Sequence, residues 1–506
     1  MIRTGRPLCC AMATVLLTAC GSSSPTSEIA TSTARGTLIE NPPFRIASLD
    51  AATLTAELNG SATGQQLLEL AGPPACGVDF YYLQYWTVGG ANESTTATGA
   101  LMVPTGTSAQ CSGGRPIVLY AHGTQTDKSF NIADITNPSN TEGALIAAMF
   151  AAQGYIVVAP NYAGYDTSSL GYHPFVDADQ NSKDMIDVLM AARTALPQTI
   201  TPTATDSGTL LLTGYSEGGF VAMATHKAMQ AAGTPVTAAA TMSGPYALEA
   251  FGDAVFYGNV NIGSTVFAPL IITSYQKAYG DIYTATTDVY EPQYALGIAT
   301  LLPSTTPIDT LFAQGKLPET ALFSNNTPVT SNPMLNAALA VPSNPIFALG
   351  FGPSNLITND YRVSYVLDAL ENPDGALPVA QPGVPLAANP QQPLRKAFKL
   401  NDLRSWVPHV PVMLCGGDQD PTVFFENTQI IQGFWLAEGL PAQAVTVVDV
   451  NGAVVPNSPF APLQEAFQAT EAQIVATQGE EAAVESYHGT VAPFCTAAAR
   501  AFFSHF

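Results

Sequence analysis

The chain has 506 residues and carries 39 acidic and 17 basic side chains, which gives a formal net charge of −22. Such a surface repels phosphate backbones and no basic stripe offsets the repulsion, so a nucleic-acid partner is excluded. Hydrophobic residues make up 47% of the chain and charged residues only 11%. This composition supports a large buried core and is not typical of a disordered acidic protein.

Residues 1–19 have the pattern of a secretory signal peptide. Arg3 and Arg6 precede a short apolar stretch at residues 11–18, which is too short to span a membrane. The next residues, Leu-Thr-Ala-Cys ending at Cys20, resemble a bacterial lipobox. This resemblance implies cleavage before Cys20 and acylation of its thiol, which would anchor the chain to a membrane. A plain secretory signal is the alternative.

Residues 20–40 are rich in serine and threonine, and we expect them to form a flexible tether. Gly21, directly after the lipobox cysteine, is similar to outer-membrane lipoproteins. We therefore expect an exported lipoprotein at the outer membrane or cell surface, with a secreted or periplasmic protein as the alternative. The membrane leaflet that would hold the anchor stays open.

Apolar runs typical of buried strands alternate with segments that have helical spacing. We expect a hairpin at residues 81–88 and 95–103, at the sheet edge, followed by helices at 143–153 and 183–196. The other strands are expected at residues 116–120, 155–159, 209–213, 236–242, 411–415 and 444–450. Val/Ile/Leu runs separated by helices indicate an α/β fold with a mostly parallel sheet covered on both faces.

The alternation stops between residues 246 and 399. This stretch follows the sixth expected strand, is rich in Pro, Asn, Ala and Thr, and contains several short helical patterns. A structureless loop of this length does not fit a compact domain, so we expect a helical cap or lid. The core would then comprise residues 41–245 and 400–506. An unrelated inserted domain is the alternative.

The segment Gly-Tyr-Ser-Glu-Gly at residues 214–218 joins an apolar strand to a helix and places Ser216 at the apex. The turn is so tight that side chains two residues before and after the serine would collide with the backbone, which explains the two glycines. The serine hydroxyl would stand clear of the sheet as a nucleophile. The amide of Glu217, first in the helix, would point at a forming oxyanion.

A serine nucleophile needs a base, and the chain has six histidines. His488 follows the last expected strand, in an expected loop before the C-terminal helix, and is our candidate base. The others fit this role less well by their position in the chain: His122, His173, His226, His409 and His505. Tyr172 and His173 are interpreted as structural residues rather than substrate contacts.

The base needs a carboxylate to orient it, and Asp418 and Asp420 both follow an expected strand. Asp420, which precedes a proline, is the preferred candidate, and Asp418 is interpreted as a turn residue. The expected triad in chain order is Ser216, Asp420 and His488. The acidic loop that begins at Asp177 lacks the glycine and glutamate of a calcium loop, so no metal site is predicted.

Four cysteines remain after the signal and Cys20 are set aside, which suggests two disulfides in an exported protein. Four cysteines allow three pairings. We favour Cys76–Cys111 and Cys415–Cys495, because each pair links segments that lie close in the expected fold. The cysteine spacing suits neither zinc nor a redox motif.

Four motifs together resemble the α/β-hydrolase superfamily. They are the strand followed by His122-Gly123-Thr124, the Gly-Tyr-Ser-Glu-Gly turn, the Gly-Gly-Asp-Gln-Asp-Pro loop and the late Tyr-His-Gly. Within the superfamily the chain is most similar to secretory lipases of the lipase A type and to related bacterial lipases and esterases. The resemblance implies the amides of Thr124 and Glu217 as oxyanion donors. One departure is the 68-residue separation of Asp420 from His488, with an extra helical segment near residues 463–479.

The expected function is that of a serine ester hydrolase, a lipase or carboxylesterase, which needs no cofactor and acts as a monomer on small-molecule or lipid esters. Apolar runs at residues 266–272 and 345–349 would either line an acyl pocket or pack the cap. A peptidase of the prolyl-aminopeptidase kind is one alternative, although the cap shows no obvious acidic cluster to bind a free amine. A catalytically inactive surface-binding lipoprotein is the other.

Overall fold

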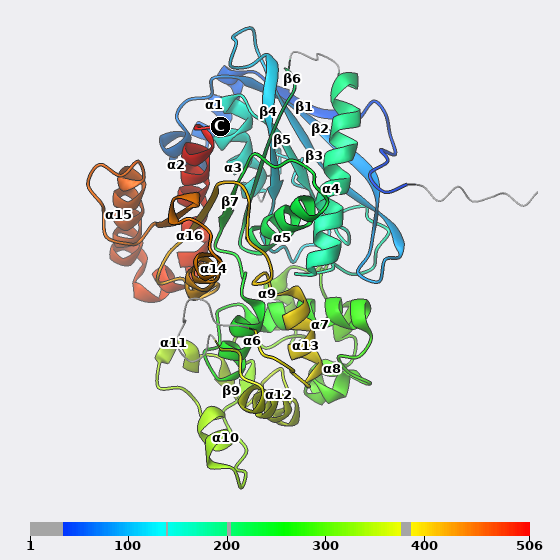
Figure 1. The fold of residues 1–506 in the computed structure, drawn as a ribbon, viewed down its shortest axis with the longest axis vertical. Helices are drawn as coiled ribbons and strands as arrows, with labels where there is room; N and C mark the ends of the chain where they lie inside the picture. The colour runs from blue at the N-terminus through cyan, green and yellow to red at the C-terminus, as the bar shows by residue number, and fades with distance from the viewer. Residues whose placement is uncertain (1–33, 138–139, 200–203, 376–385) are drawn as a thin grey trace, which may run out of the picture. The chain divides into compact units, whose positions relative to one another are not determined.

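A mostly parallel nine-stranded sheet organises the protein in the computed structural model (Figure 1). The structure describes residues 34–137, 140–199, 204–375 and 386–506. The strand order is β1-β2-β3-β5-β4-β6-β7-β10-β11. The strands are β1 (Phe44–Leu49), β2 (Gly77–Val88), β3 (Ser94–Thr105), β4 (Gly113–Ala121), β5 (Ile156–Pro160), β6 (Ala204–Tyr215), β7 (Ala238–Met242), β10 (Val412–Gly416) and β11 (Val445–Asp449).

The six strands from β5 to β11 in this order pair in parallel, whereas β1, β2 and β3 are antiparallel. The predicted α/β fold with a mostly parallel sheet is therefore confirmed. The position of the hairpin was wrong, because β1 pairs with β2 and forms the edge instead. The insertion does follow the strand expected at residues 236–242. That strand is β7, the seventh in the chain, because β1 was not predicted.

Two helical layers cover the sheet, one on each face, and each encloses an apolar cluster. One layer contains α4 (Ala178–Ala195) and α5 (Glu217–Ala231). The other contains α1 (Ala51–Asn59), α2 (Ala62–Ala71), α3 (Thr141–Met149) and α16 (Glu480–Phe503). Helix α4 begins where Asp177 accepts a hydrogen bond from the Gln180 amide, and the predicted apolar face of α4, including Met185 and Val188, is buried.

Residues between β7 and β10 form helices and one small sheet, which gather beyond one end of the large sheet (Figure 1). The helices are α6 (Leu248–Phe256), α7 (Ser264–Tyr279), α8 (Pro292–Ala295), α9 (Ile308–Ala313), α10 (Pro333–Ala338), α11 (Pro345–Ala348), α12 (Asn359–Glu371) and α13 (Pro393–Asn401). The small sheet pairs β8 (Phe323–Ser324) with β9 (Phe351–Gly352). We call this insertion the cap. Residues 34–506 form one compact unit, so the division into core and cap domains stays a prediction.

Two further helices follow the cap, α14 (Glu426–Ala437) and α15 (Ala461–Gln478). Helix α15 is the extra segment predicted near residues 463–479, and it packs against α16. Short 3-10 helices complete the fold: η1 (Ala151–Gln153), η2 (Leu196–Gln198), η3 (Thr286–Asp288), η4 (Ile298–Thr300) and η5 (Ala442–Ala444).

Residues 34–40 are the part of the predicted tether that the structure describes, and several of them contact the core. The Gly36 and Ile39 amides donate to the carbonyls of Trp86 and Gln84 on β2, and Arg35 pairs with Asp187 at 2.9 Å. Residues 35–39 therefore contact the core, within the segment that was predicted to be a tether. The signal and Cys20 lie outside the described residues. Within the described ranges, no helix is long and apolar enough to cross a membrane.

Candidate active site

Ser216 stands at the turn between β6 and α5. Its backbone conformation (φ +59°) is one that residues other than glycine rarely adopt. A side chain at Gly214 would collide with the carbonyl of Gly218, and one at Gly218 with that of Ala121. These contacts confirm the steric reason for both glycines. The strained turn directs the serine away from the strands that support it.

His488 and Asp420 are 68 residues apart in the chain, but both lie near Ser216 in the fold. His488 Nε2 is 2.8 Å from Ser216 Oγ, and His488 Nδ1 is 2.6 Å from Asp420 Oδ2. A carboxylate accepts the Nδ1 proton, which leaves Nε2 unprotonated and able to accept the serine proton. The three candidate triad residues are therefore joined in the order that general-base activation of a serine requires.

Asp420 is held by its own loop. Its Oδ1 accepts the amides of Thr422 (2.9 Å) and Val423 (3.1 Å), so that Oδ2 faces His488. Asp418 does not reach His488. Its side chain is exposed and accepts Asn451 Nδ2 at 2.8 Å, as expected of a turn residue.

The predicted loop around His488 was wrong, because His488 lies inside helix α16. The hydroxyl of Tyr215, the residue before the nucleophile, donates to the His488 carbonyl and lies 3.3 Å from Nδ1. Tyr215 thus links the nucleophile turn to the base. Sequence reasoning missed this role, since the aromatic residue inside the motif was the only signal of it.

Thr124 and Glu217, whose amides are the expected oxyanion donors, line the same cavity as Ser216. Among the described residues, no hydrogen-bond acceptor is found for either amide. The turn that carries Thr124 is fixed from behind by Glu142, which accepts the Gly123 amide (3.0 Å) and the Tyr120 hydroxyl (2.7 Å). Burial raises the pKa of Glu142 to about 7. The sequence held no signal for Glu142.

The remaining histidines do not reach Ser216. His122 stacks on Tyr162 with ring centroids 4.1 Å apart, and its burial lowers its pKa to about 4, so it is neutral near pH 7. His226 is buried against Trp406. His173 is buried and lies 2.6 Å from Glu217 Oε1, which agrees with its interpretation as a structural residue.

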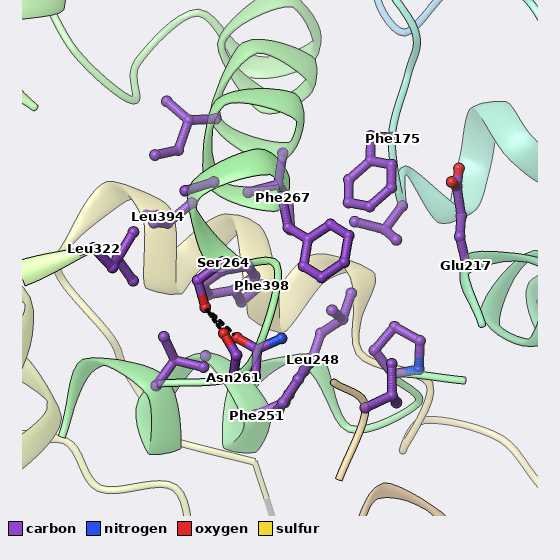
Figure 2. Close-up of a pocket in the computed structure, with 18 of the residues that line it drawn as sticks. Phe175, Glu217, Leu248, Phe251, Asn261, Ser264, Phe267, Leu322, Leu394 and Phe398 are labelled. Carbon is purple, nitrogen blue, oxygen red and sulfur yellow. Dashed lines mark hydrogen bonds between the residues drawn. The ribbon is translucent and has the colours of Figure 1, made fainter. Parts of the chain in front are cut away.

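An apolar cavity of about 110 Å³ extends from Ser216 into the cap (Figure 2). Glu217 stands at one side of the cavity, and Leu322 and Leu394 lie at the opposite side. Most of its walls are aliphatic and aromatic side chains: Phe175, Leu248, Phe251, Phe256, Phe267, Leu322, Leu394 and Phe398. One polar pair, Asn261 and Ser264, interrupts them.

Acidic side chains of the cap do cluster, contrary to the sequence-based expectation, but not at this cavity. Glu249, Asp253 and Asp368 surround buried Arg395, and its guanidinium pairs with Asp253 at 2.7 Å and with Asp368 at 2.9 Å. Arg404 pairs with Asp374 and Asp402. Glu217 is the one carboxylate among the described residues that line the cavity.

Both favoured disulfides are present, Cys76–Cys111 and Cys415–Cys495. The second joins the end of β10, just before the Asp420 loop, to α16, seven residues after His488. It therefore connects the chain segments that carry the candidate acid and base. Within the described residues, no group of side chains is arranged to hold a metal ion.

Comparisons with known proteins show what the chain is similar to in sequence and in fold. A model of the prolyl oligopeptidase family matches residues 143–245, which include Ser216. No curated protein matches the sequence. The rice cell wall degrading esterase LipA from Xanthomonas oryzae is 25% identical, with a TM-score of 0.63 over 88% of this chain and 98% of that one.

One more distant structure shares the fold. A Legionella pneumophila protein named as a hydrolase is 17% identical, with a TM-score of 0.63 over 92% of this chain and 97% of that one. Candida antarctica lipase A aligns at 12% identity and a TM-score of 0.43, over 82% of this chain and 77% of that one. The chain is therefore an esterase-like hydrolase of the α/β-hydrolase fold.

Proposed function

We propose that the protein is an exported serine ester hydrolase that cleaves apolar acyl esters through an acyl-enzyme. The observation that carries the proposal is the hydrogen-bonded chain from Asp420 through His488 to Ser216, which opens into the apolar cavity under the cap. The esterase among the similar structures supports it.

In the proposed reaction, Ser216 attacks the acyl carbonyl while His488 Nε2 takes the hydroxyl proton. Asp420 stabilises the resulting imidazolium. The amides of Thr124 and Glu217 receive the oxyanion, and such a donor contributes about 2.7–4 kcal/mol in other enzymes. His488 then protonates the leaving alcohol, and water attacks the acyl-enzyme by the same path. Apart from the ester and water, every group in these reaction steps belongs to the chain, so the proposed reaction needs no cofactor.

The cavity supports an acyl substrate because its walls are apolar and reach away from the serine. An acyl chain in contact with these walls would remove apolar surface from water, at about 25 cal/mol per Å² buried. The run at residues 266–272 supplies Phe267, Ala268, Ile271 and Ile272 to the wall, whereas no residue of the run at 345–349 lines it.

Hydrolysis of p-nitrophenyl esters from acetate to palmitate, by the mature protein and by Ser216→Ala, tests the proposal. We expect turnover that is lost in the variant, with the chain-length optimum separating an esterase from a lipase. A folded protein without activity on any ester would contradict the proposal. Activity that survives in Ser216→Ala would instead place the reaction at another residue.

A peptidase is the second candidate, and the match to the prolyl oligopeptidase family favours it. A peptidase that binds a free amine needs a carboxylate at the cavity that is free to pair with it. The cap carboxylates near Arg395 and Arg404 are already paired with these arginines, and Glu217 is paired with His173. This arrangement favours the ester. Aminoacyl p-nitroanilides, assayed beside the ester series, distinguish the two candidates.

Export and acylation at Cys20 are a separate part of the proposal. The sequence pattern at residues 17–20 and the two disulfides support an oxidising, exported location. Radiolabelled palmitate should enter the full-length chain in a bacterial host and not its Cys20→Ala variant. Equal labelling of both would contradict acylation at this thiol.

A further inference from the structure

A second buried histidine–carboxylate pair lies directly behind the nucleophile. Glu217 follows Ser216, and its side chain is fully buried, as is that of His173. His173 Nε2 lies 2.6 Å from Glu217 Oε1, and His173 Nδ1 lies 3.1 Å from the Ala163 carbonyl. The proposed mechanism uses the amide of Glu217 but leaves this carboxyl group without a role.

The hydrogen bonds fix the number of protons on the pair. A carbonyl oxygen only accepts, so Nδ1 of His173 must carry a proton toward Ala163. The contact between Nε2 and Oε1 requires one proton between these two atoms. The pair is therefore either an imidazolium with a carboxylate or an imidazole with a carboxylic acid. Its net charge is zero in both cases.

Among the described residues, Glu217 has no hydrogen-bond or ion-pair partner besides His173 that would stabilise a negative charge on its carboxyl group. Its Oε2 is buried and lacks a hydrogen-bond partner among the described residues. The rings of Tyr162, Tyr165 and Phe175 pack against His173, at centroid distances of 5.4, 4.8 and 6.1 Å. In the described chain no lysine or arginine pairs with either group. A carboxylate here without His173 would be a buried, unpaired charge.

We propose that His173 and Glu217 are a positioning pair whose neutrality lets a carboxyl side chain stand beside the oxyanion site without opposing the negative charge that forms there. The proposal rests on the proposed function, because the oxyanion forms only if Ser216 attacks an acyl carbonyl. The pair also fixes the side chain of the residue whose amide is the proposed donor. His173 does not line the cavity, so it would act through Glu217.

The effect of an unpaired charge can be bounded. Two like charges in one buried site, at an effective dielectric constant of about 20, repel enough to slow a reaction roughly 10- to 100-fold. In His173→Gln the glutamine cannot supply the second proton. A carboxylate at residue 217 would then be a buried charge with no partner. We therefore expect kcat, relative to wild type, to fall 10- to 100-fold between pH 6 and pH 9, with KM little changed.

The decisive variant is the double substitution His173→Gln/Glu217→Gln, which removes the charge but not the shape of the pair. At pH 9 the kcat of the double variant should be at least ten times that of His173→Gln. Its pH profile should run parallel to that of wild type. The matched control is His226→Gln, which also buries a glutamine in place of a histidine, on α5 and against Trp406. Its pH profile should also run parallel to wild type.

Other titratable groups around the pair must be considered in reading the profile. They are His122, Glu142, Tyr162, Tyr165 and Asp184, all buried. The same groups are present in every variant, so the ratio of each variant to the double variant isolates the Glu217 charge. If the double variant is no faster than His173→Gln at pH 9, the pair is only structural and the proposal is wrong.

A second readout does not depend on ester hydrolysis. A buried carboxylate without a partner destabilises the folded state, so such a charge in His173→Gln should lower stability at alkaline pH. The melting temperature of His173→Gln should therefore fall from pH 5 to pH 9 relative to the double variant. Equal pH dependence would contradict the neutral pair, whereas an inactive wild-type protein with the expected melting shift would contradict only the ester function.

Discussion

At the residue scale, the hydrogen bonds of Asp420 determine how an asparagine side chain would be oriented at the same position. Two backbone amides occupy Oδ1, so in Asp420→Asn the amide oxygen should take that place and the NH2 group should face His488 Nδ1. His488 would then carry its proton on Nε2 and could not accept the serine proton. We expect kcat to fall by about 10⁴ with the fold intact, as measured with the best p-nitrophenyl ester and by circular dichroism.

Asp418→Asn is the matched control for this variant. Asp418 is two residues away in the same loop, exposed, and bonded to Asn451 rather than to His488. Its kcat should stay within about threefold of wild type, because a surface contact of this kind contributes little. A large loss in Asp418→Asn together with an active Asp420→Asn would reverse the assignment of the acid.

At the element scale, sequence patterns located the elements better than their exact roles. The strand–turn–helix around Ser216 and the acid after β10 followed from local rules, because glycine spacing and strand ends are encoded nearby in the chain. The helical position of His488 did not, since helix α16 contains both Gly489 and Pro493, which disfavour helix. Packing against the sheet outweighs that preference. Strand β1 shows weak alternation of burial, so it lacks the regular apolar pattern by which a strand is found in the sequence.

The base of the cap should make stability depend on pH. Glu249 on α6 is buried near Asp253 and Asp374, and burial followed by these negative charges raises its pKa to about 8. A carboxyl whose folded pKa is raised stabilises the fold below its unfolded pKa near 4.5, and this contribution is lost as pH rises toward 8. Wild-type stability should therefore fall across this window, and Glu249→Gln should flatten the slope by up to about 1.4 kcal/mol per pH unit.

Urea unfolding at pH 5, 6.5 and 8 measures this slope. The slope of wild type also contains other buried carboxyls whose pKa values burial raises, to about 7 for Glu142 and about 6 for Asp177 and Asp184. These three groups are unchanged in Glu249→Gln and serve as the internal reference. A variant with the same slope as wild type would show that Glu249 is ionised, and paired, in the fold.

The disulfide between β10 and α16 should matter for activity as well as for stability. Cys415–Cys495 closes 80 residues of sequence and Cys76–Cys111 closes 35, so loss of either should cost about 2–4 kcal/mol of unfolding free energy. Only the first also ties the Asp420 loop to the helix of His488. Double serine substitution at Cys415 and Cys495 should lower both the urea midpoint and kcat, whereas the same change at Cys76 and Cys111 should lower the midpoint alone. Equal kcat in the two variants would show that the bridge does not position the triad.

At the scale of the whole molecule, the core supplies the candidate triad and the cap supplies most of the cavity. The two parts are joined at the acid loop: Asn261 Nδ2 donates to the Thr422 carbonyl at 2.7 Å, and the Ile262 amide donates to that of Pro421 at 2.9 Å. These bonds place the start of α7, a cavity wall, next to the residues that hold Asp420. In the proposed function, the core therefore carries out the chemistry and the cap selects the substrate. It should then be possible to change the substrate preference without changing the chemistry.

Leu322→Trp tests that separation. Leu322 lies in the cap at the side of the cavity opposite Glu217 (Figure 2), and it is buried. A larger side chain there should shorten the space for the acyl chain, so activity on palmitate should fall at least tenfold while activity on acetate stays within about twofold.

Overpacking costs about 1–3 kcal/mol of stability, so the melting temperature is recorded beside the rates. Leu296→Trp is the matched control, because Leu296 is also in the cap but is 97% exposed. It should change neither rate. If Leu322→Trp reduced both esters equally, the distal cavity would be part of the packing that holds the triad. If it reduced neither, the acyl chain would bind along another path from Ser216.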